Sequence, residues 1–284
     1  MKTVLVTAAG SGIGQATALE LDKLGFKVFA GVRKKEHGEK LSQIASSNLE
    51  AVILDVTQTN DITDLKEKLR VSLGNKGLYA LVNVAGIADF GPIEALSIDR
   101  FRQIFDVNLF GTLELTQAML PFIRKSKGRI VNVGSVGAHT TIPFGVTICA
   151  SKHALESLNS GLRIELKPWG IDVIAVDPSS IATPAANRML DQAKETIGKM
   201  TMEQRELYAE PLLSMAESMH KQEMTGAAPE TVGKVIAKAL LATKPRTRYP
   251  VGPNSKKIIL LSRLLPDRLF DRLKLKMVGI KMKV

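Results

Sequence analysis

The sequence is poor in cysteine and in aromatic residues. Cys149 is the single cysteine among 284 residues, so no disulfide can form within the chain, which suits a reducing compartment. No run of about 18 apolar residues predicts a transmembrane helix. Strand-like residues begin at Lys2, which leaves no room for a signal peptide. We therefore expect a cytoplasmic protein, with a membrane-associated protein as the alternative.

Basic residues outnumber acidic ones, and the excess is concentrated at the C-terminal end. The formal net charge is +11, and residues 256–284 hold nine basic residues against two acidic ones, with leucines and isoleucines between them. Such a tail could rest on an anionic membrane surface, or it could form a helix packed on the domain with its basic side chains in solvent. We expect no nucleic-acid binding, because aromatic residues do not alternate with the basic ones.

Strand patterns and helix patterns alternate along most of the chain. This alternation predicts a doubly wound α/β fold with a parallel sheet in one domain, residues 1–255. The predicted strands are 2–6, 27–32, 50–54, 78–84, 129–133, 171–176 and 248–251. The predicted helices are 12–24, 35–46, 57–73, 98–124, 149–166 and 229–242. A polar, methionine-rich insertion covers about 184–228, and the basic amphipathic tail, 256–284, follows the domain.

A glycine-rich loop, Thr7-Ala8-Ala9-Gly10-Ser11-Gly12-Ile13-Gly14, follows the first predicted strand. Glycines between a strand and a helix let the backbone approach a pyrophosphate, and the helix N-terminus supplies N–H donors. The second strand ends at Val32, where an acidic residue would bind a ribose 2′-hydroxyl, and Arg33 follows. An arginine there suits a 2′-phosphate, to which Ser11 could add a hydroxyl, although Arg33 could also belong to a solvated basic turn.

Residues 135–152, read together with this loop, resemble the active-site segment of the short-chain dehydrogenase/reductase family. In that family a Ser ends one strand, and a Tyr-x-x-x-Lys pair opens the next helix. Ser135 and Lys152 match the Ser and the Lys, but the residue four before Lys152 is Ile148 instead of Tyr. Ala8 replaces the first of three family glycines, and its methyl group would crowd the adenosine if the backbone there needs a positive φ.

The resemblance implies NADP(H) as the cofactor, with no metal. Two further positions differ from the family pattern: Val84 replaces an Asn, and Ser179 replaces the Gly after Pro178. The residues that the resemblance and the loop assign to the cofactor are Gly10, Ser11, Gly12, Ile13, Gly14, Arg33, Asp55, Val56, Asn83, Ala85, Gly86, Lys152, Pro178 and Thr183.

The resemblance also implies catalytic roles. Asn108 would support a proton relay, Ser135 would hold the substrate oxygen, and Lys152 would bind the nicotinamide ribose and lower the pKa of the Tyr. Ile148 cannot give or take a proton, and losing a general acid costs roughly a hundred- to ten-thousand-fold in rate. Substitute donors are His139, Thr147, Cys149 and Tyr208, each of which could instead have a packing or surface role. We assign His139, Ile148 and Tyr208 to the substrate pocket.

Three hypotheses for the function remain open. The first is a redox-neutral conversion of an apolar molecule, such as an isomerisation, cyclisation or elimination. The second is an NADP(H)-dependent oxidoreductase of a lipophilic ketone or alcohol, and the third is a non-catalytic binding protein. Six of ten methionines lie in the insertion, and flexible thioethers suit irregular apolar ligands, although they could also be packing residues. The resemblance implies a homodimer or homotetramer formed through the long helices around 98–124 and 149–167.

Overall fold

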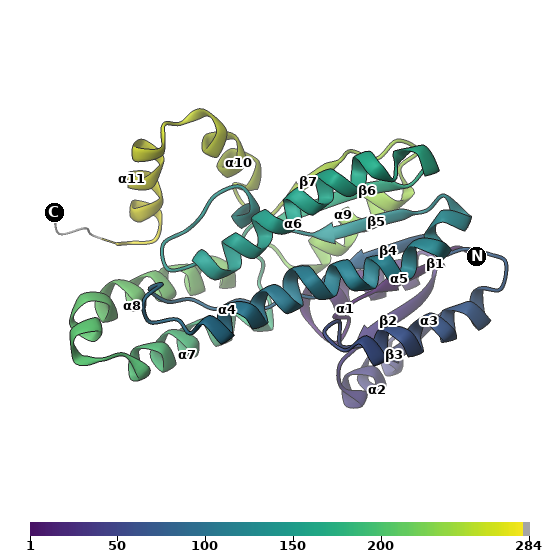
Figure 1. Cartoon of the computed structure of the whole chain (residues 1–284), viewed down its shortest axis with the longest axis horizontal. Helices are drawn as coiled ribbons and strands as arrows, with labels where there is room; N and C mark the ends of the chain where they lie inside the picture. Colours follow the sequence, from purple (N-terminus) through teal and green to yellow (C-terminus); the bar gives the residue numbers. More distant parts are fainter. Residues whose placement is uncertain (281–284) are drawn as a thin grey trace.

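Seven parallel strands form the centre of the structure, a computed structural model that describes residues 1–280 (Figure 1). The strand order is β3-β2-β1-β4-β5-β6-β7, so the chain winds outward from β1 in both directions. The central strands β1, β4 and β5 are rich in Val, Leu and Ile and are buried along nearly their whole length, as expected of a doubly covered parallel sheet. The strands are β1 (Thr3–Val6), β2 (Lys27–Val32), β3 (Leu49–Ile53), β4 (Ala80–Asn83), β5 (Arg129–Val133), β6 (Asp172–Pro178) and β7 (Arg248–Val251).

Helices cover both faces of the sheet and bury two apolar cores. On one face, α1 (Gly12–Lys23), α2 (Lys35–Ile44) and α9 (Pro229–Leu241) pack over β-strand side chains. On the other face lie α3 (Thr59–Leu73), α5 (Gly111–Ser126) and α6 (Val146–Glu165). This arrangement confirms the predicted α/β fold class.

The helix predicted over 98–124 is interrupted. It consists of α4 (Ile98–Phe105), a π-helical turn (Asp106–Phe110) and α5. The π-helical turn carries Asn108, whose side chain hydrogen-bonds to the backbone of Ile87 in the loop after β4. The helix predicted over 149–166 begins three residues earlier, at Val146.

The methionine-rich insertion and the basic tail both form helical pairs. The insertion consists of α7 (Pro184–Lys199) and α8 (Met202–Met224), which we call the lid. Within residues 1–280 the tail consists of α10 (Ser255–Leu264) and α11 (Asp267–Met277), which we call the tail hairpin. Residues 281–284 of the predicted tail lie outside the described part. Lid and tail hairpin lie at the same end of the molecule, far from the N-terminus (Figure 1).

A third apolar cluster joins these added helices to the domain. Its buried members come from the lid, from the loop after β4 and from the end of the tail hairpin: Phe90, Met189, Ala193, Met200, Leu212, Met215, Ala216 and Val278. In the described residues, no helix combines the length and the hydropathy needed to cross a bilayer.

Candidate active site

The glycine-rich loop has the close backbone packing that a nucleotide site needs. A Cβ at Gly14 would lie 2.2 Å from the carbonyl oxygen of Ala8, so only glycine fits there. Gly12 has a φ of +55°, and a Cβ on it would lie 3.5 Å from Cγ2 of Thr183. The fold therefore brings the loop and Thr183, two predicted cofactor positions, to one place.

Ala8 adopts the left-handed conformation that its glycine counterpart would adopt without strain. Its φ is +51°, the condition under which the methyl group was expected to crowd the adenosine. The residue is exposed at the mouth of the loop. Left-handed φ angles cost a residue with a Cβ roughly 1–2 kcal/mol, so the loop carries a small strain.

The end of β2 presents basic groups to solvent. Val32 is buried, whereas Arg33 is exposed at the point where the chain turns into α2. His37, which the sequence analysis did not single out, lies over the loop, because a Cβ at Gly10 would be 2.9 Å from its Nδ1. Arg33 and His37 thus flank the region where a 2′-phosphate would be recognised.

Three of the predicted cofactor residues have structural partners. Asn83 is buried and donates from Nδ2 to Oδ1 of Asn132 at 2.7 Å, toward the α5–α6 face of the sheet. Asp55 accepts from the backbone N–H and the hydroxyl of Thr57, at 3.0 and 2.7 Å. Val56 is buried against Gly111, where a Cβ would lie 2.5 Å from the Val56 carbonyl oxygen. The second carboxylate oxygen of Asp55 and the buried Oδ1 of Asn83 have no partner among the described residues.

Thr7 performs the strand-tying role that Val84 cannot. Its Oγ1 accepts from the backbone N–H of Val84 at 2.8 Å and of Ala85 at 3.0 Å. These bonds hold the end of β1 against the Ala85–Gly86 turn and keep the turn open beside the glycine-rich loop. The strand-end position of Thr7 was the available signal for this role.

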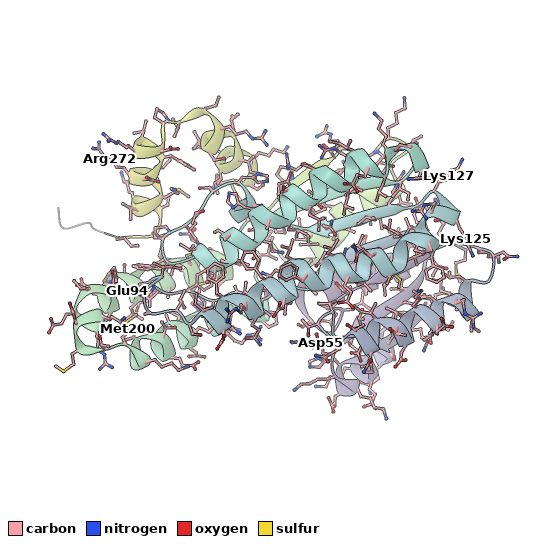
Figure 2. The ribbon with its side chains drawn as sticks, in the orientation of Figure 1. Asp55, Glu94, Lys125, Lys127, Met200 and Arg272 are labelled. Atoms are coloured by element: carbon pink, nitrogen blue, oxygen red, sulfur yellow. The ribbon has the colours of Figure 1, made fainter. Side chains whose placement is uncertain are left out.

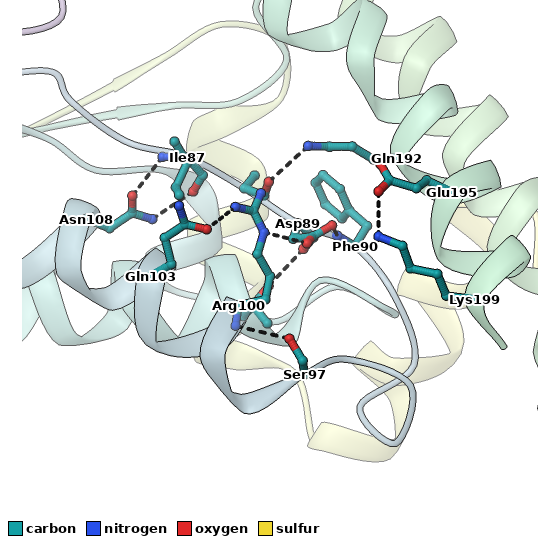
Figure 3. A network of polar contacts seen from close by, with 12 residues as sticks. Ile87, Asp89, Phe90, Ser97, Arg100, Gln103, Asn108, Gln192, Glu195 and Lys199 are labelled. Atoms are coloured by element: carbon teal, nitrogen blue, oxygen red, sulfur yellow. Dashed lines mark hydrogen bonds and ion pairs between the residues drawn. The ribbon is translucent and has the colours of Figure 1, made fainter. Parts of the chain in front are cut away.

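Asn108 holds the next part of the cleft together (Figure 3). Its Oδ1 accepts from the Ile87 N–H at 2.8 Å, while Nδ2 donates to the Ile87 carbonyl and to Oγ of Ser151, both at 2.9 Å. The Ser151 hydroxyl in turn donates to the carbonyl oxygen of Ile148 at 2.8 Å. Asn108 thereby fixes the backbone of the very position at which the family places its Tyr.

The loop that follows Ile87 links the cleft to α4 and to the lid. Nε of Arg100 on α4 contacts Oδ2 of Asp89 at 2.8 Å, and Gln192 of α7 donates to the Ala88 carbonyl at 3.5 Å (Figure 3). Arg100 and Asp89 are both partly buried, so this ion pair is better shielded from solvent than an exposed pair.

Lys152 is a buried cation at the centre of the site. Its Nζ donates to the Val133 carbonyl at 2.8 Å, and a Cβ at Gly86 would lie 3.6 Å from this Nζ. Burial lowers the pKa of the Lys152 ammonium to about 8, and attraction to Asp177 opposes part of that shift. Since an ammonium has three hydrogens, two remain for a ligand that enters beside Gly86.

Ser135 is positioned at the end of β5 to donate a hydrogen bond. Its Oγ accepts from the Gly137 N–H at 2.9 Å and thereby caps the short helical turn Val136–Ala138. Among the described residues, its O–H has no acceptor in the structure, so the hydroxyl can donate to a substrate oxygen.

Ile148 packs against the third apolar cluster, which joins the lid to the domain. Phe144 and Tyr208 pack against the same cluster, and their rings meet edge to face with centroids 6.4 Å apart. The predicted substrate residues Ile148 and Tyr208 are thus brought together by the lid. Hydrocarbon and aromatic groups surround the place where the family has its proton donor.

The other candidate donors have partners elsewhere. Thr147 is buried and donates to the Asp89 carbonyl at 2.8 Å. Cys149 is buried, and this burial raises the pKa of its thiol. His139 contacts Oδ2 of Asp177 at 3.0 Å through Nε2, so its ring is directed to the sheet and does not join the Ile148–Tyr208 group.

His139 is part of a charged cluster beneath Lys152 that sequence reasoning missed. Asp177 at the end of β6 is fully buried and also contacts Nε of Arg248 at 3.2 Å, and Arg248 pairs with Glu156 of α6. His139, Glu156 and Asp177 have ligand atoms within 4.8 Å of one another, but the Arg248 guanidinium already supplies the positive charge among them. Within this cluster, Asp177 is the carboxylate that also attracts Lys152.

Comparison with known proteins agrees with this geometry. A family profile described as short chain dehydrogenase matches residues 2–194. Retinol dehydrogenase 16 from Mus musculus is 35% identical over 282 residues, covering 96% of this chain and 87% of that protein. The chain therefore belongs to the short-chain dehydrogenase family, which confirms the resemblance.

Two further similarities extend the picture. Estradiol 17-beta-dehydrogenase 2 from Mus musculus is 42% identical over 186 residues, which cover 64% of this chain and 49% of that protein. A crystal structure of a short-chain dehydrogenase from Streptomyces avermitilis superposes with a TM-score of 0.76 at 25% identity, covering 98% of this chain and 97% of that one. The named relatives are dehydrogenases, so the comparisons give no support to the redox-neutral hypothesis.

Proposed function

We propose that the protein is an NADP(H)-dependent oxidoreductase that interconverts a ketone or aldehyde and an alcohol on a lipophilic molecule of retinoid or steroid type. The observation that carries this proposal is that exposed Gly86 lies beside the side chains of Asn108 and Lys152. A Cβ at Gly86 would lie 3.4 Å from Asn108 Oδ1 and 3.6 Å from Lys152 Nζ, so a polar ligand over this exposed glycine comes close to both groups. The dehydrogenases named above, whose names refer to retinol and estradiol, support the same class of chemistry.

The glycine-rich loop fits a dinucleotide cofactor. Gly14 lets the start of α1 pack closely on the backbone of Ala8, which presents the N-terminus of α1 to a pyrophosphate, and exposed Arg33 is available for a 2′-phosphate. When bound, NADPH supplies the hydride that reduces the carbonyl carbon. The residues of this chain orient the substrate, exclude water and deliver the proton.

Lys152 is the group that we assign to proton delivery in place of the absent Tyr. The Ser135 O–H donates to the substrate oxygen, and the Lys152 ammonium transfers a proton to that oxygen as the alcohol forms. With a pKa of about 8, Lys152 is protonated at neutral pH and acidic enough to give up its proton. It regains a proton from solvent on the exposed side of Gly86.

The side chains of Ile148, Phe144 and Tyr208, which we call the apolar wall, suit a hydrocarbon substrate. Ile148 and Phe144 present carbon atoms, Tyr208 adds a ring and the hydroxyl of a candidate proton donor, and the lid methionines Met189 and Met215 belong to the same cluster. Burial of apolar surface against such a wall is the main source of affinity for lipophilic ligands.

Isotope transfer tests the proposal. The protein is incubated with NADPH deuterated at the transferable position and with a retinoid aldehyde or a 17-ketosteroid, and the product is examined by mass spectrometry. Deuterium on the new carbinol carbon, lost in the Lys152→Met variant, is expected. A product that forms without deuterium would instead support a redox-neutral conversion, and binding of the lipid without any product would support a binding protein.

A further inference from the structure

The tail hairpin exposes leucines among basic residues. Leu260 and Leu264 on α10 are 56% and 68% exposed, and Leu269 on α11 is 52% exposed. Leu260 and Leu264 are one helical turn apart and share a face. The exposed basic residues of the hairpin are Lys256, Lys257, Arg263, Arg268, Arg272 and Lys276.

The hairpin stands away from the sheet. The turn between α10 and α11 points outward from the domain (Figure 1), and Arg272 projects to the outside of α11 (Figure 2). Of its two acidic residues, Asp271 is paired with Lys274 at 2.8 Å, which leaves Asp267 against the exposed cations. The outer surface is therefore strongly positive, with apolar side chains between the charges.

We propose that the tail hairpin docks the protein on an anionic lipid bilayer, with Leu260, Leu264 and Leu269 inserted among the acyl chains and the basic residues on the headgroups. Leucines buried at the headgroup boundary and cations near anionic lipids each favour binding, and the two effects add. A bilayer fits better than a protein partner because exposed basic residues flank the exposed leucines on both helices of the hairpin, the combination that an anionic membrane surface attracts.

The inner side of the hairpin is attached to the candidate active site. The Ser218 hydroxyl and the Gln222 amide of α8 donate to the Met277 carbonyl at 3.4 and 3.0 Å. Val278 is buried in the same apolar cluster that Ile148 joins. At the other end of the hairpin, Ser179 donates to the Pro253 carbonyl at 2.7 Å. Docking through the outer side would therefore bring the lid and its apolar wall to the bilayer surface.

Vesicle co-sedimentation tests the docking surface. The full chain is mixed with vesicles of phosphatidylcholine alone or of phosphatidylcholine with phosphatidylserine, at low and at high salt. We expect binding to the anionic vesicles that weakens with salt and that falls at least about tenfold in the Leu260→Ser/Leu264→Ser/Leu269→Ser variant. A Lys257→Glu/Arg263→Glu/Arg272→Glu variant should lose the preference for anionic lipid.

Matched controls lie at the opposite end of the molecule. Lys125 and Lys127 project from that end (Figure 2), and the Lys125→Glu/Lys127→Glu variant should bind vesicles like the wild-type protein. Circular dichroism verifies that every variant is folded. The proposal is overturned if the wild-type chain fails to bind anionic vesicles, if both charge variants lose binding equally, or if the leucine variant changes only the oligomeric state. None of these readouts depends on NADPH or on turnover.

Discussion

At the scale of single residues, we expect a Tyr at position 148 to deliver the proton faster than Lys152 does in the natural sequence. The backbone of Ile148 is held in place through Ser151 and Asn108, so a Tyr side chain there would start from the family's position. We predict that Ile148→Tyr raises the rate of NADPH-linked carbonyl reduction by roughly a hundredfold or more. The matched control is Ile148→Phe, which adds the ring without the hydroxyl. Equal rates in the two variants would show that the hydroxyl has no catalytic effect.

Lys152 makes the free energy of unfolding depend on pH. Its pKa is lowered from 10.5 to about 8 in the folded protein, so between these values the unfolded chain binds more protons. Stability should therefore rise as the pH increases from about 8 to 10.5, by up to roughly 3 kcal/mol, whereas below pH 8 the full cost of the buried charge is present.

Denaturant unfolding across this pH range checks the prediction. The Lys152→Met variant should be more stable than the wild-type protein at neutral pH and should lack the alkaline rise. The exposed residue Lys66 provides the control, because Lys66→Met should leave the pH profile unchanged. A wild-type profile that parallels that of Lys152→Met would contradict the assigned burial of the cation.

Ala8 stores strain in the glycine-rich loop. Because its φ is +51°, replacing it with glycine removes the left-handed penalty, although glycine loses more conformational entropy on folding. We predict that Ala8→Gly stabilises the protein by roughly 0.5–1 kcal/mol and tightens NADPH binding. The neighbouring Ala9, which is fully buried, provides the contrast: Ala9→Gly should destabilise. Thermal melts and cofactor titrations of both variants measure these effects.

At the scale of elements, we expect the stability of the lid helix α8 to depend on pH through the ionisation of Glu223. Near the end of α8 it accepts from the Ile181 N–H at 3.0 Å, and burial raises its pKa from 4.5 to about 7 against the opposing effect of that hydrogen bond. Between these values the folded state binds more protons, so this group's contribution to stability falls as the pH rises from 4.5 to 7 and stays low above it.

Hydrogen exchange in α8 reports this effect directly. Above pH 7 the Glu223→Gln variant, which keeps an acceptor for Ile181 but carries no charge, should protect the end of α8 better than the wild-type residue does. Glu217 lies exposed on the same helix, and Glu217→Gln should not alter the exchange. Equal protection in Glu223→Gln and the wild-type protein would contradict the prediction.

The elements also show what sequence reasoning can and cannot recover. The parallel sheet and the loop from Gly10 to Gly14 were predictable, because strand patterns, helix patterns and glycine spacing are local signals. The π-helical turn at Asn108 was not, since it depends on a contact with Ile87 from a distant segment. The direction of His139 likewise follows from Asp177 and Arg248, whose proximity only the folded sheet creates.

The tail and the insertion were recognised by composition, but their arrangement was not. Neither the sequence's charges nor its methionines indicate that each segment folds into two helices or that Val278 and Ile148 join one cluster.

At the scale of the whole molecule, we expect homodimers or homotetramers formed through the helices of 98–126 and α6. Phe110 is 55% exposed and Ile164 is 70% exposed on these elements, which leaves apolar surface for a second copy. A Phe110→Asp/Ile164→Asp variant should lower the mass measured by light scattering, whereas Leu24→Asp at another exposed apolar site should not. A wild-type protein that remains monomeric would refute this expectation.

Cofactor binding tests the central claim most directly. Titration calorimetry of the purified protein with NADPH and with NADH measures whether the cleft is a dinucleotide site and which cofactor it prefers. The account predicts that NADPH binds more tightly than NADH and that Arg33→Ala removes most of the difference while Lys66→Ala does not. The absence of NADPH binding at about millimolar concentration would contradict it, because physiological cofactor sites typically bind well below that range. Equal affinities for the two cofactors would refute the assignment of Arg33 to the 2′-phosphate.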